Sequence, residues 1–484
     1  MRILIAAFLF VLMAIVLPAL LVTGAGRGDF VFVVLSLSLI AYGAIRVVFG
    51  IVSPRPSLLV AMYGVFVYMN LGLAPLLQAP YRQFPWPSNY SDGVILGVYA
   101  CLGWGCLAFE LGVWLAQRKG EGRILFIDKI FMLPCSIPRL NFLCLAGIPL
   151  LGGLFLLTGW HHALFVSRSE VGVFAVGTLS TSPLVVIALT LLRLFPLVIT
   201  VLLGLLLLEQ WRASSREKKG GWPIVVYIGF LFFYGLMAVL ITNPVSSPRY
   251  WVATVWGGIL ITGMHFIKID ARRWFPVVLL LGYLVVFPIA DHFRRSLDSD
   301  KAQAFVEGGI FSGIRNNLRG GDFDGFQQIA NAISVSQENG FTWGRQLAGT
   351  VLNFVPRSMW GGKPEQTGAY LAYMSGYNYY NLSCPLWAEG YVDFSWIGTF
   401  VYLFLCGYGL VMIERGRARE GSCSLGAILA IIFSCYSIFF LRGALMNVAP
   451  FIWTLASLLL FLCFRISSDG QRALRPRPIR GEFL

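Results

Sequence analysis

Long apolar segments recur along the whole sequence, and they constrain the fold more than any other feature. Only 12% of the residues are charged and 57% are hydrophobic, so a water-soluble core of this size would lack enough polar surface to cover it. A helix needs roughly 20 apolar residues to cross the ~30 Å hydrocarbon core of a bilayer, so we predict an all-α, polytopic transmembrane bundle of about 12 helices. The predicted spans lie near residues 3–23, 30–51, 57–78, 93–116, 140–160, 184–208, 222–243, 250–268, 275–292, 387–413, 422–442 and 449–465.

Basic residues are concentrated in alternate connections between these spans. The basic connections are Arg118 to Arg139, Arg212 to Lys219, Lys268 to Arg273, Arg415 to Arg419, and the tail with Arg472, Arg475, Arg477 and Arg480. The positive-inside rule places these connections, and both chain termini, in the cytoplasm. This arrangement assigns the whole net charge of +14 to one face, so the charge indicates membrane topology and we expect no nucleic-acid partner.

The chain divides into four parts on this basis. Residues 1–292 form a transmembrane bundle of about nine helices, and residues 387–465 add about three more. Between them, residues 293–386 form a large extracytoplasmic (periplasmic) loop, whose many aromatic residues argue against disorder. Residues 466–484 form a basic cytoplasmic tail. The first apolar run follows Arg2 as in a signal peptide, but it is too long for one, so we interpret it as a membrane helix.

The extracytoplasmic loop is predicted to be partly helical. Asp322 can cap a helix start, and Phe323, Phe326, Ile329, Ala330 and Ile333 follow it at helical spacing. A second helix is expected from Arg345 to Val355, where Pro356 stops it. We expect such helices to lie in the membrane interface, with their apolar faces toward lipid or toward the bundle.

Cysteine and histidine usage predicts neither disulfides nor a metal site. Most of the nine cysteines fall in or beside apolar spans, and Cys384 alone lies in a clear outer loop. The four histidines, His161, His162, His265 and His292, show no metal-ligand spacing. We therefore expect no metal and no cofactor.

A set of basic residues in the loop is the first candidate for chemistry. Arginine presents a planar fork that binds phosphate oxygens through two hydrogen bonds, and nearby rings suit sugar faces. The alternative is a set of ion pairs with the loop's acidic residues on a solvated surface. The set comprises Arg315, Arg319, Arg345, Arg357 and Lys363, and Arg249 adds a further arginine at the predicted start of the eighth span.

Two carboxylates at the start of the tenth span are the second candidate. Glu389 and Asp393 are four residues apart, so a helix places both on one face, near Trp387 and Tyr391. Ionisable residues at membrane depth are functional candidates, and the alternative is an interfacial anchor with carboxylates reaching toward water. Glu110 is a further intramembrane charge, and a pair with one of the arginines near the spans would stabilise the bundle.

Three stretches resemble the Wzy-type O-antigen and capsular polysaccharide polymerases: RGGDFDGFQQ (319–328), GRQLAGTVLNFVPRSMWGGKPEQTG (344–368) and PLWAEGYVDFSWIG (385–398). The shared elements are an Arg before an Asp/Phe-containing helix, a Pro-Arg…Trp…Lys-Pro block, and an Ala-Glu…Asn/Asp-Phe-Gly-like helix start. This chain departs from the last element, because Ser395 stands at the Gly position. Arg357 and Gly368 also fit an R-x10-G pattern of some family members.

The resemblance implies a metal-independent, GT-C-like glycosyltransferase at the outer face of the bacterial inner membrane. Its substrate would be an oligosaccharide repeat unit on undecaprenyl diphosphate, and its product would be O-antigen, capsule or exopolysaccharide. A chain-length regulator protein would be a further partner. Glu389, and second to it Asp322, would activate the acceptor hydroxyl. The residues that would bind substrate are Arg249, Arg319, Arg345, Arg357 and Lys363 at the diphosphate, with Trp360 and Tyr391 as sugar platforms.

Three other functions compete with polymerisation. An O-antigen ligase uses the same donor and a similar loop but transfers to lipid A-core. A transporter or flippase would suit about 12 spans, although a two-halves transporter usually carries its long loop in the middle and inside. A non-enzymatic envelope scaffold would need no active site at all.

Overall fold

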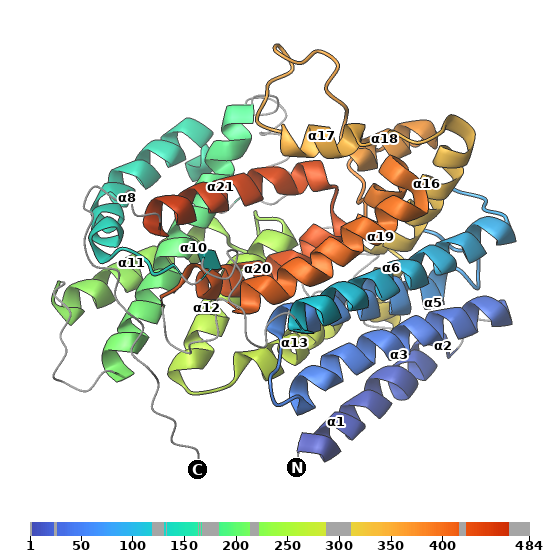
Figure 1. The fold of residues 1–484 in the computed structure, drawn as a ribbon, viewed down its shortest axis with the longest axis horizontal. Coiled ribbons are helices and arrows are strands. Elements are labelled where there is room, and N and C mark those ends of the chain that lie inside the picture. The colour runs from blue at the N-terminus through green and yellow to red at the C-terminus, as the bar shows by residue number, and fades with distance from the viewer. Residues whose placement is uncertain are drawn as a thin grey trace.

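The chain folds into a bundle of long helices (Figure 1). The computed structural model describes residues 2–23, 27–118, 130–131, 133–162, 164, 166, 183–212, 222–286, 311–415 and 423–463. Within these ranges the regular elements are helical, apart from one isolated bridge between Pro134 and Ser424. The prediction of an all-α, multi-pass membrane bundle is therefore confirmed for the described part of the chain. The basic tail, residues 466–484, lies outside it.

Ten helical segments of the described chain are long and apolar enough to cross a membrane. They are Arg2–Val22 (α1, η1 and α2), Phe30–Val52 (α3), Leu58–Gln78 (α4, η2 and α5), Asp92–Arg118 (α6), Ile137–Thr158 (α8), Pro183–Arg212 (α10), Ile224–Ile241 (α11), Leu386–Arg415 (α19), Leu425–Arg442 (α20) and Leu445–Cys463 (α21). Two further predicted spans correspond to α12 (Arg249–Phe266) and to α13 (Ala271–Leu281) with η4 (Gly282–Val286). The count of about 12 spans stays a prediction, because α12 is less apolar and residues 287–292 lie outside the described ranges.

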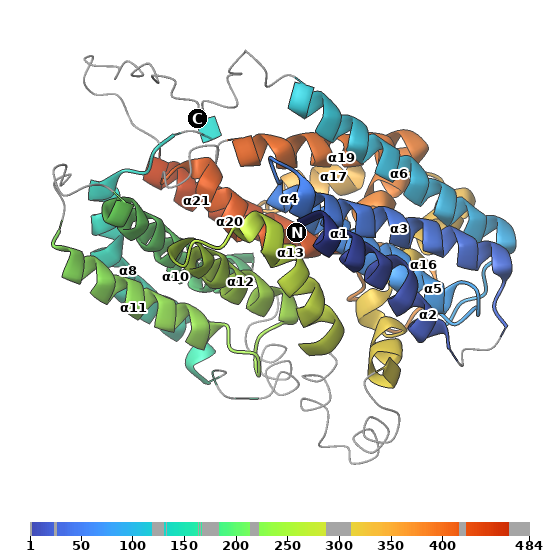
Figure 2. The same ribbon diagram turned by 90° about the horizontal axis from the view of Figure 1, so that it is seen from below.

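Two spans form the centre of the bundle. Leu58–Gln78 is buried along its whole apolar window, and α10 is almost as enclosed. Helix α20 packs on both α4 and α12, which joins the N-terminal helices to the group formed by α8, α10, α11 and α12 (Figures 1 and 2). Helices α6 and α19 run side by side, and a Cβ at Gly112 or Gly407 would collide with the backbone of the partner helix. Small residues thus permit close packing where no hydrophobic effect drives association.

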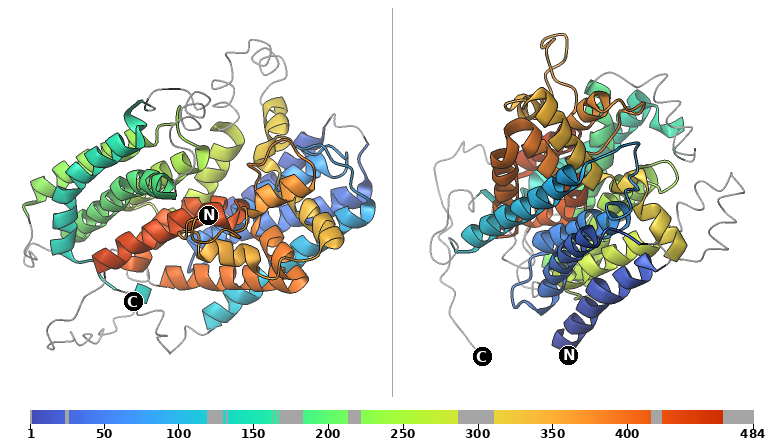
Figure 3. Two further views of the ribbon diagram at one scale, coloured as in Figure 1. Left: turned by 90° about the horizontal axis from the view of Figure 1, so that it is seen from above. Right: turned by 90° about the vertical axis from the view of Figure 1, so that its right-hand side faces the viewer.

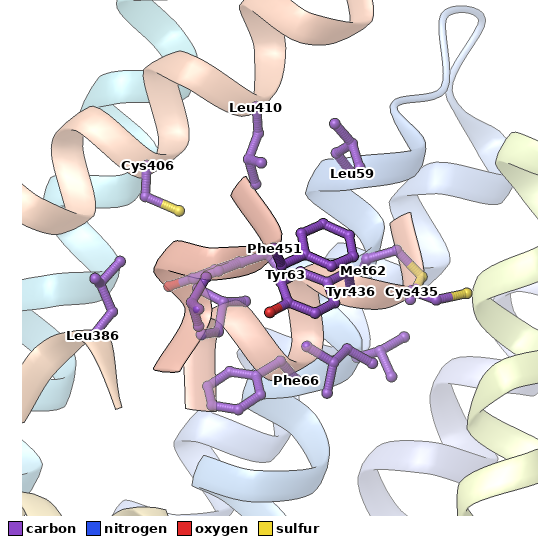
Figure 4. Close-up of a cluster of buried hydrophobic side chains, with 14 of the residues drawn as sticks. Leu59, Met62, Tyr63, Phe66, Leu386, Cys406, Leu410, Cys435, Tyr436 and Phe451 are labelled. Atoms are coloured by element: carbon purple, nitrogen blue, oxygen red, sulfur yellow. The ribbon is translucent and has the colours of Figure 1, made fainter. Parts of the chain in front are cut away.

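Stacked aromatic rings fill the junction of α4, α19, α20 and α21 (Figure 4). The ring of Tyr436 on α20 stacks on Phe451 of α21 with centroids 3.4 Å apart, and Tyr63 of α4 stacks on Phe109 of α6 at 3.5 Å. All four side chains are buried. Large buried aromatic side chains contribute strongly to packing, so these rings help to hold the helices together.

The intramembrane charge on Glu110 is paired, and its partner is Arg46. The guanidinium of Arg46 on α3 forms an ion pair with the carboxylate of Glu110 on α6, which also accepts a hydrogen bond from the Tyr42 hydroxyl at 2.5 Å. Separating this pair would leave a charge in an apolar setting, a loss of several kcal/mol. The structural role expected for Glu110 is therefore confirmed, with Arg46 as its partner.

Hydrogen bonds tie the connections together at each end of the bundle. At one end they join Asp29 to Pro80, Gln78 to Leu318, Arg315 to Thr23, Arg249 to Asp322 and Cys384 to Arg442. At the other they join Arg273 to Ile51 and Ser53, Leu59 to Glu414, Arg415 to Ala116, and Cys135 to Cys423. Connections predicted to share a side of the membrane therefore contact one another, as the alternating charge pattern requires.

Residues 311–385, which we call the cap, cover the first of these ends (Figures 1 and 3). The cap comprises a helix at residues 311–318, η5 (Gly321–Phe323), α16 (Gly325–Asn339), α17 (Arg345–Val351) and α18 (Thr367–Met374). Helix α16 packs on α6 and α19, and α17 packs on α21. The loop is thus partly helical where it is described; residues 293–310 lie outside the described ranges.

The predicted helix start, with Asp322 as its cap, is wrong by two residues. Residues 321–323 form a single 3-10 turn, and α16 begins at Gly325 after Asp324. The Asp322 carboxylate does not cap this helix, because it forms an ion pair with Arg249 instead. A distant charged partner has overridden the local capping preference. Helix α17 likewise ends at Val351, short of Pro356.

Helix α19 is interrupted at Phe394 and Ser395. Ser395 has φ +57° and ψ −145°, a backbone conformation that is natural for glycine and strained for other residues. The interruption frees the carbonyl oxygens of Val392 and Asp393, which accept the N–H groups of Thr342 and Trp343 from the cap at 2.9 and 3.0 Å. The kink therefore anchors the cap to α19, at the position where the resembled motif has Gly.

We expect Ser395→Gly to stabilise the protein. The substitution removes the steric cost of a side chain at this φ, which is worth roughly 1 kcal/mol. Thermal unfolding of the purified protein in detergent should show a higher midpoint. Ser457→Gly, the same change within the regular helix α21, is the control and should lower it. An unchanged or lower midpoint for Ser395→Gly would show that the kink is unstrained.

Candidate functional site

Two arginines from different membrane helices meet an aspartate of the cap. Arg249 begins α12, Arg442 ends α20, and Asp322 lies in η5. Arg249 Nη1 is 2.8 Å from Asp322 Oδ2, and Arg442 Nη2 is 3.9 Å from Asp322 Oδ1. Arg442 Nη2 also lies 3.5 Å from Asp324 Oδ1. We call Arg249, Asp322, Asp324 and Arg442 the Asp322 cluster.

The two carboxylates of this cluster differ in their access to solvent. The Asp324 side chain is 1% exposed, and it accepts hydrogen bonds from the Trp86 indole at 3.0 Å and from the Ser383 hydroxyl. Asp324 is therefore held by the surrounding protein. The Asp322 side chain is 50% exposed, so a substrate can reach it while the arginines hold it in place.

Two buried guanidinium donors near η5 lack a hydrogen-bond partner within the described residues. They are Nε of Arg442 and Nε of Arg319, which lies two residues before Gly321. Gly321 in turn accepts a hydrogen bond from Arg442 Nη2 at 3.0 Å. A buried donor without a partner costs about 1–3 kcal/mol, so this region is suited to an anion that would accept these hydrogen bonds.

Three of the other predicted basic residues, Arg345, Arg357 and Lys363, lie together in a second place, whereas Arg315 donates to Thr23 O at 2.6 Å instead. Residues 352–366, which we call the cap hairpin, follow α17 and project from the cap (Figure 3). Arg345 donates to Gly362 O at 3.0 Å, and Arg357 pairs with Glu365 at 2.7 Å. Lys363 Nζ donates to Asn353 O at 2.6 Å and to Val355 O at 2.9 Å.

The ammonium group of Lys363 is partly buried and lies near Arg357. Partial burial lowers the pKa of its ammonium group below the ordinary value, and repulsion from Arg357 lowers this pKa further. Trp360 lies in the same hairpin and is half-buried, and its carbonyl accepts the N–H of Lys363. The hairpin is thus a compact group of cations with one ring beside it.

The turn between α20 and α21 connects the two basic groups. Arg442 belongs to the Asp322 cluster, whereas Met446 O accepts a hydrogen bond from Asn353 of the cap hairpin at 2.9 Å. Four residues of fully extended chain span at most ~14 Å, so the Cα atoms of Arg442 and Met446 lie within that distance. One extended ligand carrying a phosphate and several sugars could therefore touch both groups.

Glu389 lies between the cap and the membrane helices, and it is 1% exposed. One carboxylate oxygen accepts the Thr367 hydroxyl of α18 at 2.6 Å, and the other accepts the backbone N–H of Leu445 at the start of α21 at 2.8 Å. Both oxygens are therefore engaged by the protein. These contacts favour a positioning role, in which Glu389 fastens α18 and α21 to the start of α19.

Asp393 and Tyr391 are also enclosed. The Asp393 carboxylate is fully buried and accepts hydrogen bonds from Thr342 at 2.5 Å, Leu347 N–H at 3.0 Å and Tyr402 at 2.9 Å. It therefore binds the first turn of α17, whose N–H groups favour a negative charge. The Tyr391 ring is 5% exposed and packs edge-on against Phe341 and Trp396, so its faces are covered.

A different aromatic pair lies beside the Asp322 cluster. The ring of Trp86 stacks on Tyr379 with centroids 5.4 Å apart, and Tyr379 is 49% exposed. A Cβ at Gly321 would lie 3.0 Å from the Trp86 ring, so the ring edge adjoins η5. No sequence pattern singles out Trp86, since it lies in a short connection more than 200 residues from Asp324.

Neither a metal centre nor a related protein guides the interpretation of this site. Within the described ranges, no group of three or more His, Cys, Asp and Glu residues could hold a metal ion, and the metal-independent reaction stays a prediction. All nine cysteines are described and are free. Comparisons of the chain with protein-family models, curated proteins and solved structures find no match.

Proposed function

We propose that the protein is a membrane glycosyltransferase that polymerises lipid-diphosphate-linked oligosaccharides at the outer face of a bacterial inner membrane. The observation that carries this proposal is the convergence of Arg249 and Arg442 on Asp322, beside Nε donors of Arg442 and Arg319 that have no hydrogen-bond partner among the described residues. A diphosphate is the anion that such a set of forked donors suits best. The motif resemblance in residues 319–398 supports the same activity, and the glycine-like backbone of Ser395 agrees with it.

The proposed reaction transfers the growing chain to the next repeat unit. An acceptor hydroxyl oxygen attacks the anomeric carbon of the donor, and the bond from that carbon to the diphosphate oxygen breaks. The bonding electrons leave with the diphosphate, whose negative charge the arginines stabilise. The hydroxyl proton passes to a carboxylate. We favour Asp322 over Glu389 as this base, because the Asp322 side chain is half-exposed whereas Glu389 is buried.

The surroundings of Asp322 supply the other parts that this reaction needs. The diphosphate would compete with Asp322 for the guanidinium groups of Arg249 and Arg442, and the half-exposed carboxylate lies where it could accept a proton. The Trp86–Tyr379 pair offers an aromatic platform for a sugar attached to that diphosphate, in the role first expected of Trp360 and Tyr391. Arg345 at the start of α17, together with Arg357 and Lys363 of the cap hairpin, would bind the second lipid-linked unit or a further part of the chain.

The lipid-linked glycans of a strain without this protein test the proposal directly. We expect the strain to lose long polysaccharide and to retain lipid A-core capped with a single repeat unit. Mass spectrometry of the extracted glycolipids measures both. Polymer that persists on the lipid carrier and is lost only from lipid A would instead indicate a ligase. Repeat units that accumulate on the inner leaflet would indicate a flippase, and an unchanged profile would overturn the enzymatic proposal.

A further inference from the structure

An apolar groove runs between α19, α20 and α21. It has a volume of about 420 Å³, and all of its lining residues are apolar. The lining extends along α20 from Leu425 to Phe440, which is ~22 Å of helix at 1.5 Å per residue. The groove therefore spans most of the hydrocarbon thickness from one end of the bundle toward the cap.

Small residues keep this groove open. Gly409 on α19 and Ala456 on α21 both line it. A Cβ added at Gly409 would meet no heavy atom within 4 Å, so no packing contact requires glycine at this position. Glycine within a helix lowers stability by about 0.5–1 kcal/mol relative to alanine, so the presence of glycine at position 409 needs another explanation. An occupant of the groove would provide one.

The cap hairpin lies beside α21 near the upper part of the groove. The ring of Phe354 packs edge-on against Trp453 of α21, with centroids 5.9 Å apart. Trp453 follows the groove residue Ile452, and it lies eight residues, or ~12 Å, along α21 from Leu445. The hairpin therefore contacts α21 beside the groove, and this same hairpin carries Arg357 and Lys363.

We propose that the groove binds the hydrocarbon chain of a polyprenyl phosphate lipid whose phosphate contacts the cap hairpin. The choice of a polyprenyl chain rests on the proposed function. The proposed function does not say where that chain binds, and this inference assigns it to the groove. An extended hydrocarbon chain fits the dimensions. A volume of about 420 Å³ over ~22 Å gives a cross-section of about 20 Å², far less than that of a helix 10–12 Å across.

A photoreactive lipid probe tests the site. The full-length protein in nanodiscs is labelled with a polyprenyl phosphate that carries a diazirine in its chain, and the labelled peptides are mapped by mass spectrometry. We expect labelling on α19 and α21 around the groove. Gly409→Phe should fill the groove and reduce this labelling at least fivefold. Gly229→Phe is the matched control, since a Cβ at Gly229 on α11 also meets nothing within 4 Å, and it should change labelling less than twofold.

Competition separates a specific site from ordinary lipid contact. Unlabelled polyprenyl phosphate should displace the probe, whereas an equal amount of phosphatidylglycerol should not. Equal displacement by both lipids, or equal labelling of Gly409→Phe and wild type, would overturn the proposal. If Gly409→Phe does not yield folded protein, Ala456→Leu narrows the same groove and decides the question. Groove labelling in a protein whose deletion leaves the glycan profile unchanged would uphold the lipid site and refute the polymerase, so the two failures are distinguishable.

Discussion

Arg442→Ala is expected to abolish long polysaccharide while single-unit-capped lipid remains. Arg442 contacts Asp322, Asp324 and Gly321 O, and its Nε is one of the two donors without a hydrogen-bond partner in the described part of the chain. Removing one donor that stabilises a developing negative charge typically costs 10²–10³-fold in rate. We expect a comparable loss for Arg249→Ala. Complemented deletion strains, compared by polysaccharide gel, measure this effect at matched protein levels determined by immunoblot.

A second arginine at the same end of the bundle provides the control. Arg82 forms an ion pair with Asp92, and the two side chains are 41% and 68% exposed. Exposed pairs contribute roughly 0–1 kcal/mol, so Arg82→Ala should leave the polymer ladder unchanged. Arg442→Lys keeps the charge but loses the planar fork and should be strongly impaired. A normal ladder in both Arg442→Ala and Arg249→Ala would refute the proposed diphosphate site.

Amide substitution of the two candidate bases is expected to affect polymer formation to different extents. Asp322→Asn should reduce polymer formation at least 100-fold at normal protein levels, because a general base contributes 10²–10⁴-fold. Glu389→Gln should retain most activity, since its side chain can still accept one of the two hydrogen bonds from Thr367 and Leu445. Polymer length in cells and protein recovery after purification measure the two effects separately.

Replacing Glu389 with alanine should lower the stability of the folded protein, in addition to any effect on the reaction. Glu389→Ala leaves the Thr367 hydroxyl and the Leu445 N–H buried without acceptors, at about 1–3 kcal/mol each. We therefore expect low recovery of folded protein and a reduced unfolding temperature. If Glu389→Gln instead folds normally and makes no polymer, while Asp322→Asn remains active, the role of base returns to Glu389.

The membrane character of the chain follows from local sequence properties. Each span is defined by its own length and hydrophobicity, so Arg2–Val22 or Leu425–Arg442 can be predicted without knowledge of its neighbours. The cap was also expected to be ordered, because its aromatic content suits burial. Its helix boundaries were less accurate: η5 and the later start of α16 depend on the contact of Asp322 with Arg249, which no local pattern reveals.

The sequence by itself therefore determined that this protein crosses the membrane many times and which residue types could bind a diphosphate. Only the tertiary structure decided which of them meet. Arg249, Asp322 and Arg442 are far apart in the chain and lie on three elements whose packing brings them together. Glu389 and Asp322 look alike as carboxylates in a sequence, yet one is enclosed by two helices and the other is half-exposed. Burial and pairing are properties of long-range packing, and helical periodicity carries information only over the few residues of a turn.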